Sequence, residues 1–450
     1  MAYRTVDNPV LFILIMDKRN KDILNIALPS IVSNITVPLL GLVDMAIVGH
    51  MGDASYIGAI AVGSMVFNVI YWIFGFLRMA TSGMTSQAFG RGDKSESADL
   101  LSRALTVGIG IGLVFVAAQV PVGWLAMKAM QPTADVYYLA QRYFSICIWG
   151  APAVLGLYSM TGWFIGMQNT RVPMVVSIMQ NVVNIMASVV FVYVLGMKVE
   201  GVALGTLTAQ YAGLAMAMAM LRRRYRSMLH AYTIKALADG KAMMRFFTVS
   251  RDIFLRTLFL VAVNLFFTSA GASQGAVILA VNTMLFQLFT LYSFVMDGFA
   301  YAGEAIGGRY YGAGDAAGLK DTVSRLFKWQ LVMTIAYTLI YAAGSGTFVS
   351  LLTDEAAVTA AASDYLPWAV AIPFAGMGAF YWDGLYIGLT ATRGMLAATF
   401  SGATAFFTVY LTLFPVWGNH ALWLSLVMYL VTRGVVQTLM WKKICGKLCG

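Results

Sequence analysis

The sequence predicts an all-α integral membrane protein with twelve transmembrane helices in two six-helix lobes. Hydrophobic residues make up 60% of the chain and charged residues 11%, and the mean hydropathy is +0.75. So few polar side chains cannot cover a water-soluble surface. Apolar stretches of roughly 20 residues, the length of one membrane span, recur along nearly the whole sequence. A duplicated segment divides the chain into two similar halves.

Short polar breaks separate the expected spans. In chain order, the spans begin near Ile23, Tyr56, Ala98, Val136, Val172, Gly201, Ile253, Ala276, Leu319, Val358, Gly394 and Ala421. The apolar stretches 56–89 and 276–311 exceed the length of a minimal span. We therefore expect some helices to tilt, bend or protrude from the bilayer.

The duplication is clearest in the decapeptide GWFIGMQNTR at 162–171, which has a near-copy, GLYIGLTATR, at 384–393. The offset is 384 − 162 = 222 residues, and FGRGD at 89–93 matches YGAGD at 311–315 with the same offset. Each half then holds six spans, so both halves enter the membrane from one side and are related by a pseudo-twofold axis along the membrane normal. Two such lobes enclose a cavity that can open alternately to either side, as a secondary transporter requires.

Each copy of the decapeptide also predicts local structure. Its two glycines are four residues apart, a spacing that allows close helix contact in membranes. The Thr-Arg pair that follows falls where the chain reaches the membrane interface. We expect Arg171 and Arg393 to anchor equivalent turns by binding helix-end carbonyls, lipid phosphates, or the nearby Asp93 and Asp315.

The basic residues predict the orientation. The net charge of +10 alone could indicate nucleic acid, but with a cytoplasmic N-terminus most Lys and Arg residues fall on the cytoplasmic side, and only Lys128 and Lys198 lie in external loops. This distribution satisfies the positive-inside rule. We expect a monomer in the cell inner (plasma) membrane, with both termini cytoplasmic, contacts to membrane lipids and no nucleic-acid partner. The expected domains are an N-lobe at 1–221, a cytoplasmic linker at 222–251 that begins with RRRYR, and a C-lobe at 252–450.

Several motifs resemble one transporter family. They are LPSIVSNITVPLLGLVDMAIVGHMG at 28–52, the repeated GRGD/GAGD and TR turns, and DGFAYAGEA at 297–305. Together they resemble the DinF-like branch of the multidrug and toxic compound extrusion (MATE) family over nearly the whole chain. The resemblance implies a twelve-helix antiporter that exports amphipathic and often cationic organic compounds, xenobiotics included, in exchange for protons or sodium ions, without another cofactor.

Asp44 is the principal candidate for ion coupling. It is an acid at bilayer depth, where an ionisable group is costly without a partner and usually functional. Pro38, six residues earlier, removes a backbone donor and predicts a bend in the first helix. In an apolar cavity, protonation and release at Asp44 could follow the proton gradient. The alternative is a carboxylate permanently hydrogen-bonded to neighbouring helices.

Polar residues of the fifth span are expected beside Asp44. Asn181, Asn184 and Ser188 are spaced by three and four residues, which places them on one helical face. In MATE relatives, an Asn and then an Asp four residues later accompany the first-helix Asp. The matching pair here is Asn184 and Ser188, so the second carboxylate is missing. Asn34 is expected either in this network or in helix packing.

A second polar cluster is expected from three further acids and two arginines at depth: Asp297, Glu304, Asp383, Arg78 and Arg256. Asp383 resembles the tenth-helix acid of the cation site in other MATE branches. Those branches also carry a glutamate in the seventh helix, whereas residues 256–267 contain no acid. Because a sodium site needs several oxygen ligands, protons are favoured, with sodium as the alternative.

The second and eighth spans also suggest an ion pair. Matching Phe67 to Phe286 gives an offset of 219 in this region and places Arg78 opposite Asp297. We therefore expect an internal Arg78–Asp297 pair, with substrate contact as the alternative for Arg78. Tyr71 and Gln287, together with Phe286, are further candidates for lining the substrate cavity.

Two other function classes are disfavoured by the residues present. A flippase or exporter of a lipid-linked or metabolite substrate shares the two-lobed plan, but a pyrophosphate would require several cationic side chains inside the cavity. An enzyme would require a nucleophile or metal cluster, whereas the histidines His50, His230 and His420 lie far apart. No GxxxxGK[ST] loop is present for ATP-driven export. We expect a secondary transporter without a metal site.

Overall fold

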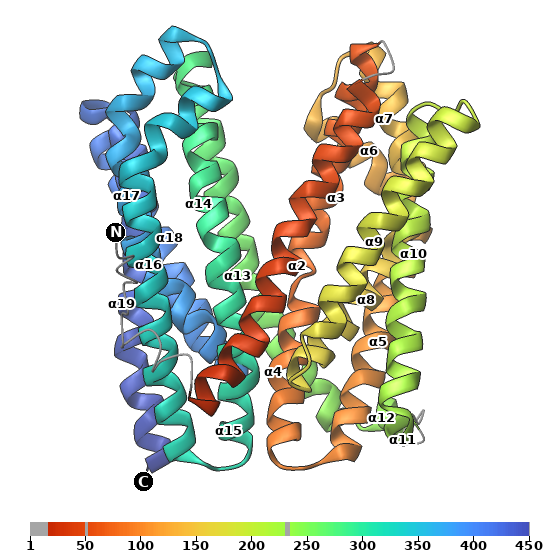
Figure 1. Cartoon of the computed structure of the whole chain (residues 1–450), viewed down its shortest axis with the longest axis vertical. Coiled ribbons are helices and arrows are strands. Elements are labelled where there is room, and N and C mark those ends of the chain that lie inside the picture. Colours follow the sequence, from red (N-terminus) through yellow and green to blue (C-terminus); the bar gives the residue numbers. More distant parts are fainter. Residues whose placement is uncertain (1–16, 50–52, 230–234, 450) are drawn as a thin grey trace, which may run out of the picture.

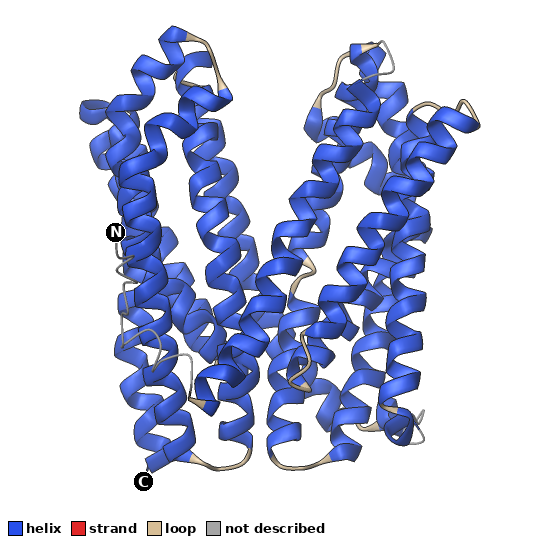
Figure 2. Cartoon of the chain, viewed as in Figure 1, coloured by secondary structure: helices blue, strands red, loops and turns tan. Residues whose placement is uncertain are grey.

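The computed structural model describes residues 17–49, 53–229 and 235–449, and the regular structure of these ranges is entirely helical (Figure 2). The long helices form two groups that lie together at one end of the molecule and diverge toward the other (Figure 1). We call the end where the two groups lie together the linker end, because the connection between the halves lies there. We call the end where they diverge the open end. His50 and His230 lie outside the described residues.

The described part of the first half forms six rods, where a rod is one helix or a run of consecutive helices that continue in one direction. Several of these rods are interrupted. α3 and α4 are separated at residues 74–75, α5 meets α6 at residue 118, and a 3₁₀ turn at Ile148–Gly150 joins α7 to α8. A π-helical turn, η2 at Val190–Val194, ends the α9 rod. The helices are α2 (Lys18–Gly49), α3 (Ala54–Ile73), α4 (Phe76–Gly90), α5 (Lys94–Ala117), α6 (Gln119–Met130), α7 (Ala134–Cys147), α8 (Ala151–Gly166), α9 (Arg171–Val189) and α10 (Val199–Arg224).

The second half forms six further rods over the described ranges, and a π-helical turn, η3 at Gly303–Gly307, interrupts the second of them. The helices are α13 (Gly240–Ala272), α14 (Ala276–Ala302), α15 (Gly308–Gly312), α16 (Ala316–Leu352), α17 (Ala356–Gly388), α18 (Thr392–Trp417) and α19 (Asn419–Cys449). Two short helices, α11 (Arg226–Leu229) and α12 (Lys235–Ala238), lie in the connection. The expected linker at 222–251 includes the last turn of helix α10, which ends at Arg224, and the first turns of helix α13, which begins at Gly240.

Ten of these rods are long and apolar enough to cross a membrane, counted over the described residues. The remaining two, α2 and α17, have 32 and 33 residues. Helix α2 packs against α9 of its own half and α14 of the other half, and α17 packs against α14 and α19. Helix α2 continues through residue 38, where the sequence predicted a bend.

The duplicated glycines make the predicted close contacts. A Cβ atom added at Gly162 would lie 2.2 Å from the carbonyl oxygen of Arg78, and one added at Gly384 would lie 2.1 Å from that of Ala300. These contacts are equivalent, because 300 − 78 and 384 − 162 both equal 222. The offset of 219 that matched Arg78 with Asp297 is therefore wrong. The helix break at residues 74–75 separates Phe67 from Arg78, so an offset taken at Phe67 does not hold beyond the break.

The acidic turn residues cap helices and do not bind the nearby arginines. The Asp93 carboxylate accepts a hydrogen bond from the Glu96 N–H at 2.9 Å, and Asp315 accepts one from the Gly318 N–H at 2.8 Å. Such caps satisfy backbone donors that have no partner within the helix. Arg171 is exposed, and neither acid forms an ion pair with a described residue. Of the three partners expected for the two arginines, Asp93 and Asp315 are therefore wrong, whereas helix-end carbonyls and lipid phosphates stay predictions.

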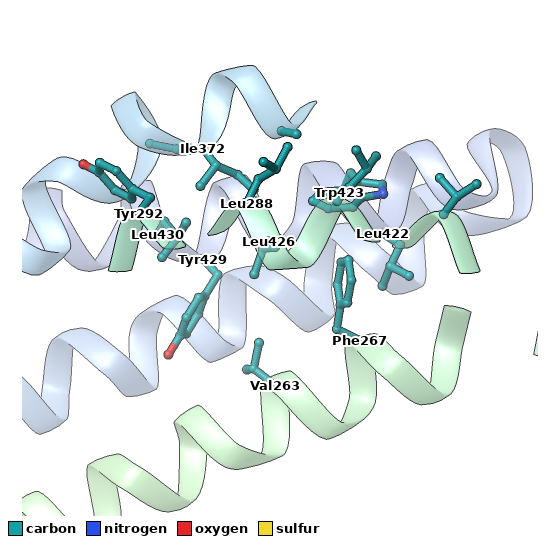
Figure 3. Packing of buried hydrophobic residues seen from close by; sticks show 14 of the residues in the cluster. Val263, Phe267, Leu288, Tyr292, Ile372, Leu422, Trp423, Leu426, Tyr429 and Leu430 are labelled. Atoms are coloured by element: carbon teal, nitrogen blue, oxygen red, sulfur yellow. The ribbon is translucent and has the colours of Figure 1, made fainter. Parts of the chain in front are cut away.

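The largest apolar core lies in the second half, between α13, α14, α17 and α19 (Figure 3). Phe267 packs edge-on against Trp423, with ring centroids 5.1 Å apart. Asn282 exchanges side-chain amide hydrogen bonds with Asn419 at 2.8 Å and accepts another from the Trp423 indole at 2.9 Å. These bonds give the buried side chains of Asn282, Asn419 and Trp423 polar partners.

Candidate functional site

Asp44 lies in the first half as a buried carboxyl. Its residue is 6% exposed, and its Oδ1 atom has no hydrogen-bond partner among the described residues. It interacts electrostatically with Tyr143 and Cys147 of α7. The apolar side chains Ile47 and Val48 on the next turn of α2 belong to a buried cluster. The described residues around Asp44 therefore supply no cation to hold it in its charged form.

The polar residues of α9 bind other groups than Asp44. The Asn181 amide donates to the Thr36 carbonyl of α2 at 2.7 Å, and the Asn184 amide donates to the Thr206 hydroxyl of α10 at 3.1 Å. Asn184 and Ser188 are fully buried, and Asn184 Oδ1 and Ser188 Oγ have no partner in the described ranges. No hydrogen bond between described residues joins Asp44 to this set.

The two helices nevertheless bring Asp44 and Ser188 to similar heights. Helix α9 runs alongside α2 in the same direction, because Asn181 bonds to Thr36 and the Tyr193 hydroxyl donates to the Ile47 carbonyl at 3.2 Å. Asp44 and Ser188 lie between these two bonds along their helices. We call Asp44, Asn181, Asn184 and Ser188 the N-lobe site.

The candidate cavity residues have different surroundings. The Asn34 amide donates to the Phe294 carbonyl at 3.1 Å and so joins α2 to α14 of the second half. The Tyr71 hydroxyl is buried without a partner among described residues, and its ring stacks on Phe67. Phe286 packs against Phe267 and Phe289, whereas Gln287 is exposed.

Asp383 is the centre of a charge cluster within the second half. The Arg433 Nη2 atom donates to Asp383 Oδ2 at 2.6 Å, Arg256 Nη2 donates to the same oxygen, and the Gln437 amide donates to Oδ1 at 2.9 Å. These donors come from α13 and α19. The sequence pattern predicted Asp383 and Arg256 in one cluster but did not indicate Arg433 or Gln437. Arg433 could have been found, because it is a lone charge within the last apolar stretch.

Arg78 pairs with Glu304 and not with Asp297. The Arg78 Nη1 atom lies 3.3 Å from Glu304 Oε2, and the exposed fractions of the two side chains are 12% and 1%. Asp297 forms no ion pair or hydrogen bond with any described residue, although it interacts electrostatically with Arg78 and Asp383. The expected Arg78–Asp297 pair is wrong, because Arg78 corresponds to Ala300, and the glutamate side chain reaches the guanidinium from one turn farther along.

The two halves are joined tightly at the linker end. The Gln87 amide of α4 donates to the Gly388 carbonyl at 2.8 Å, and the Gln168 amide donates to the Ala305 carbonyl at 2.7 Å. A Cβ atom at Gly90 would lie 2.0 Å from the Arg309 carbonyl oxygen. Gln168 and Thr390, 222 residues apart, both have left-handed backbones, with φ of 62° and 52°. These contacts were not predicted from the sequence.

The MatE family model matches residues 29–190 and 253–411, one stretch in each half. The chain belongs to the MATE transporter family. It is 34% identical to DNA damage-inducible protein F of Escherichia coli, over 94% of this chain and 92% of that protein. It is also 23% identical to Protein DETOXIFICATION 45, chloroplastic, of Arabidopsis thaliana, over 94% and 79% of the two chains.

The fold of solved MATE structures is shared over nearly the whole length. The structure described as MATE in the bent conformation superposes with a TM-score of 0.85 at 18% identity, covering 97% of each chain. An outward-facing multidrug resistance MATE transporter superposes with a TM-score of 0.82 at 17% identity, covering 97% and 98%. The predicted MATE fold and the DinF-like resemblance are confirmed. This multi-pass membrane protein is an efflux transporter and not an enzyme.

Proposed function

We propose that this transporter exports amphipathic organic cations in exchange for protons, and that Asp44 binds the coupling proton. The observation that carries the proposal is the difference between the buried acids. Asp383 and Glu304 are held by arginines, and Asp297 interacts electrostatically with Arg78, whereas Asp44 has no cationic partner among described residues. A carboxyl without an ion pair can take up and release a proton without leaving a partner charge uncompensated.

Sodium is the alternative coupling ion. The unpartnered oxygens Asp44 Oδ1, Asn184 Oδ1 and Ser188 Oγ would be suitable ligands, but only one of them carries charge. The alternative flippase function is less supported, because Arg256 and Arg433 both bind Asp383 within the second half, and Arg78 pairs with Glu304 in this conformation.

The proposed orientation places the linker end in the cytoplasm of the cell and the protein in the inner (plasma) membrane, with both termini cytoplasmic. Support comes from Arg222, Arg223 and Arg224 in the last turn of α10 and from the basic residues that begin α13. In this orientation the lobes diverge toward the outside (Figure 1), so the conformation is outward-facing. Single-cysteine labelling checks it: a cysteine at position 241 should not react with an impermeant reagent in intact cells.

The coupling test uses the full chain in proteoliposomes loaded with ethidium, with an imposed pH gradient or an imposed sodium gradient. Wild-type protein should respond to the pH gradient, and Asp44→Asn should lose that response, since the amide mimics a permanently protonated carboxyl. Ethidium binding by Asp44→Asn in detergent should remain. Undiminished pH-driven transport by Asp44→Asn would rule Asp44 out, and transport driven only by sodium would favour the alternative ion.

A further inference from the structure

The guanidinium of Arg78 lies between the halves, surrounded by groups of one helical face. Arg78 belongs to α4, whereas Glu304, Tyr301 and Asp297 belong to the α14–η3 rod of the second half. The Arg78 Nη1 atom is 3.3 Å from Glu304 Oε2, the guanidinium carbon is 4.2 Å from the Tyr301 ring centroid, and Asp297 interacts with Arg78 electrostatically. Residues 297 and 301 are four apart in α14, so they project from one face, and Glu304 follows in η3 and contacts the same guanidinium.

These surroundings have the composition of an organic-cation site. A carboxylate neutralises the charge of such a ligand, and an aromatic face binds its polarised surface, most strongly where water is excluded. Tyr158 of α8 adds a second phenol, which interacts electrostatically with Tyr301 and Arg78. The Glu304 side chain is almost fully buried. The Arg78 guanidinium therefore occupies a position on the second half that suits an organic cation.

The Arg78–Glu304 pair differs from the Asp383 cluster in two respects. Asp383 accepts three hydrogen bonds from its own half, whereas Glu304 accepts one from the opposite half. Separation of the halves at the linker end would leave Asp383 and its donors together but would part Glu304 from Arg78. An uncompensated buried charge is costly, so Glu304 then requires another cation.

We propose that Glu304, Tyr301 and Asp297 bind the cationic group of the substrate when the transporter is open to the cytoplasm, and that Arg78 displaces this group when the lobes close there. This inference rests on the proposed export of organic cations. The exchange replaces one cation by another, so the site stays neutralised in both conformations. Arg78 is an intramolecular competitor that releases the substrate toward the outside.

The test measures binding of tetraphenylphosphonium to the purified full chain by isothermal titration calorimetry, without an ion gradient. Arg78→Gln removes the competitor and should tighten binding about tenfold, equivalent to about 1.4 kcal/mol. Adding Glu304→Gln to that variant should abolish the gain, and adding Tyr301→Leu should reduce it about threefold. Arg142→Gln is the matched control, because it breaks an exposed pair with Glu200 and should not change the affinity.

Unchanged affinity in a folded Arg78→Gln variant, or a gain that survives Glu304→Gln, would overturn the inference. If Arg78→Gln does not fold, Arg78→Lys keeps the charge but loses the planar guanidinium and should gain about threefold; no gain would overturn the inference as well. If Asp44→Asn keeps pH-driven transport but Arg78→Gln binds tetraphenylphosphonium more tightly, the coupling proposal is wrong and the cation site proposed here stands.

Discussion

The two halves share the duplicated helix contacts but carry different side chains at equivalent positions. With the offset of 222, Asp44 corresponds to Phe266, Asn184 to Phe406 and Ser188 to Tyr410. In the second half these aromatic residues contact one another: the Phe266 ring centroid lies 5.9 Å from that of Phe406 and 4.9 Å from that of Tyr410. The first half places a carboxyl, an amide and a hydroxyl at the equivalent positions.

A reverse difference occurs nearer the linker end. Asp383 and Arg256 form part of a charge cluster in the second half, and their counterparts at the same offset are Thr161 and Asn34. At these equivalent positions, the described residues therefore place a carboxyl without an ion-pair partner in the first half and a cluster of one carboxylate and two arginines in the second. The duplication therefore gives both halves one scaffold, whereas the proposed proton exchange would use the first half alone.

The largest expected effect is on accumulation of folded protein, and it comes from disrupting the close glycine contacts that both halves share. Gly162→Leu and Gly384→Leu should each abolish accumulation of folded protein, because even a Cβ atom would lie about 2 Å from a carbonyl oxygen of the neighbouring helix. Fluorescence-detected size-exclusion chromatography checks this result. Gly110→Leu is the matched control, since a Cβ atom at Gly110 has no neighbour within 4 Å. Normal accumulation of either variant would show that the close contact is dispensable.

The sequence predicted the membrane spans and the glycine contacts well, because burial in a membrane directly restricts which residues a span can contain. The expected spans lie within a few residues of the observed rods except at the seventh, where α13 begins at Gly240 and not near Ile253. Basic residues in the first turns of α13 suggested a linker, although a helix can extend beyond the bilayer with such residues. The close contacts of the glycine pairs were predicted correctly, because small residues four apart in apolar helices are typical of close helix packing.

The next effect compares the acids of the two halves. Asp383→Asn should destabilise the protein by about 3–5 kcal/mol, because it leaves Arg256 and Arg433 without a counter-charge in a buried site. Asp44→Asn should leave stability unchanged or improve it, since Asp44 has no cation partner among the described residues. Thermal unfolding followed by tryptophan fluorescence measures both. Equal destabilisation by the two substitutions would contradict the proposed division between the lobes.

The side-chain partners were harder to predict than the spans. The sequence identified the acids at depth, because a charged residue in an apolar stretch is conspicuous. It assigned Arg78 to the wrong acid, since the break at residues 74–75 and the π-helical turn η3 change which residues lie opposite, and apolar periodicity does not reveal either irregularity. The bonds from Gln87 and Gln168 were missed for a similar reason: they depend on how two rods meet, 301 and 137 residues apart in sequence.

A smaller effect is expected from adding a second acid to the N-lobe site. Ser188→Asp places a carboxylate at the height of Asp44, near the unpartnered Asn184 Oδ1 atom. Several oxygen ligands with two charges suit a metal cation better than one charge does. We expect sodium to raise the thermal stability of Ser188→Asp but not that of the wild type. A matched substitution in the second half, Tyr410→Asp, should gain no sodium response, because Phe266 and Phe406 supply no ligands. A sodium response of the wild type equal to that of Ser188→Asp would favour sodium coupling.

The smallest effect is expected at the duplicated arginines, where the halves resemble each other most. Arg171 and Arg393 are exposed, and the carboxylates nearby serve as helix caps, so truncating either side chain breaks no ion pair with a described residue. Arg171→Ala and Arg393→Ala should each change stability by no more than about 0.5 kcal/mol, as surface substitutions usually do.

The threonines adjacent to these arginines are buried, and their hydroxyls donate to the Ile26 carbonyl in one half and to the Asp252 carboxylate in the other. Thr170→Val and Thr392→Val should therefore cost more than the arginine substitutions, about 1 kcal/mol each. Export of several cations, compared between variants at matched protein levels, separates this architectural role from recognition: a changed order of preference in Arg171→Ala would place the duplicated turn in the substrate path.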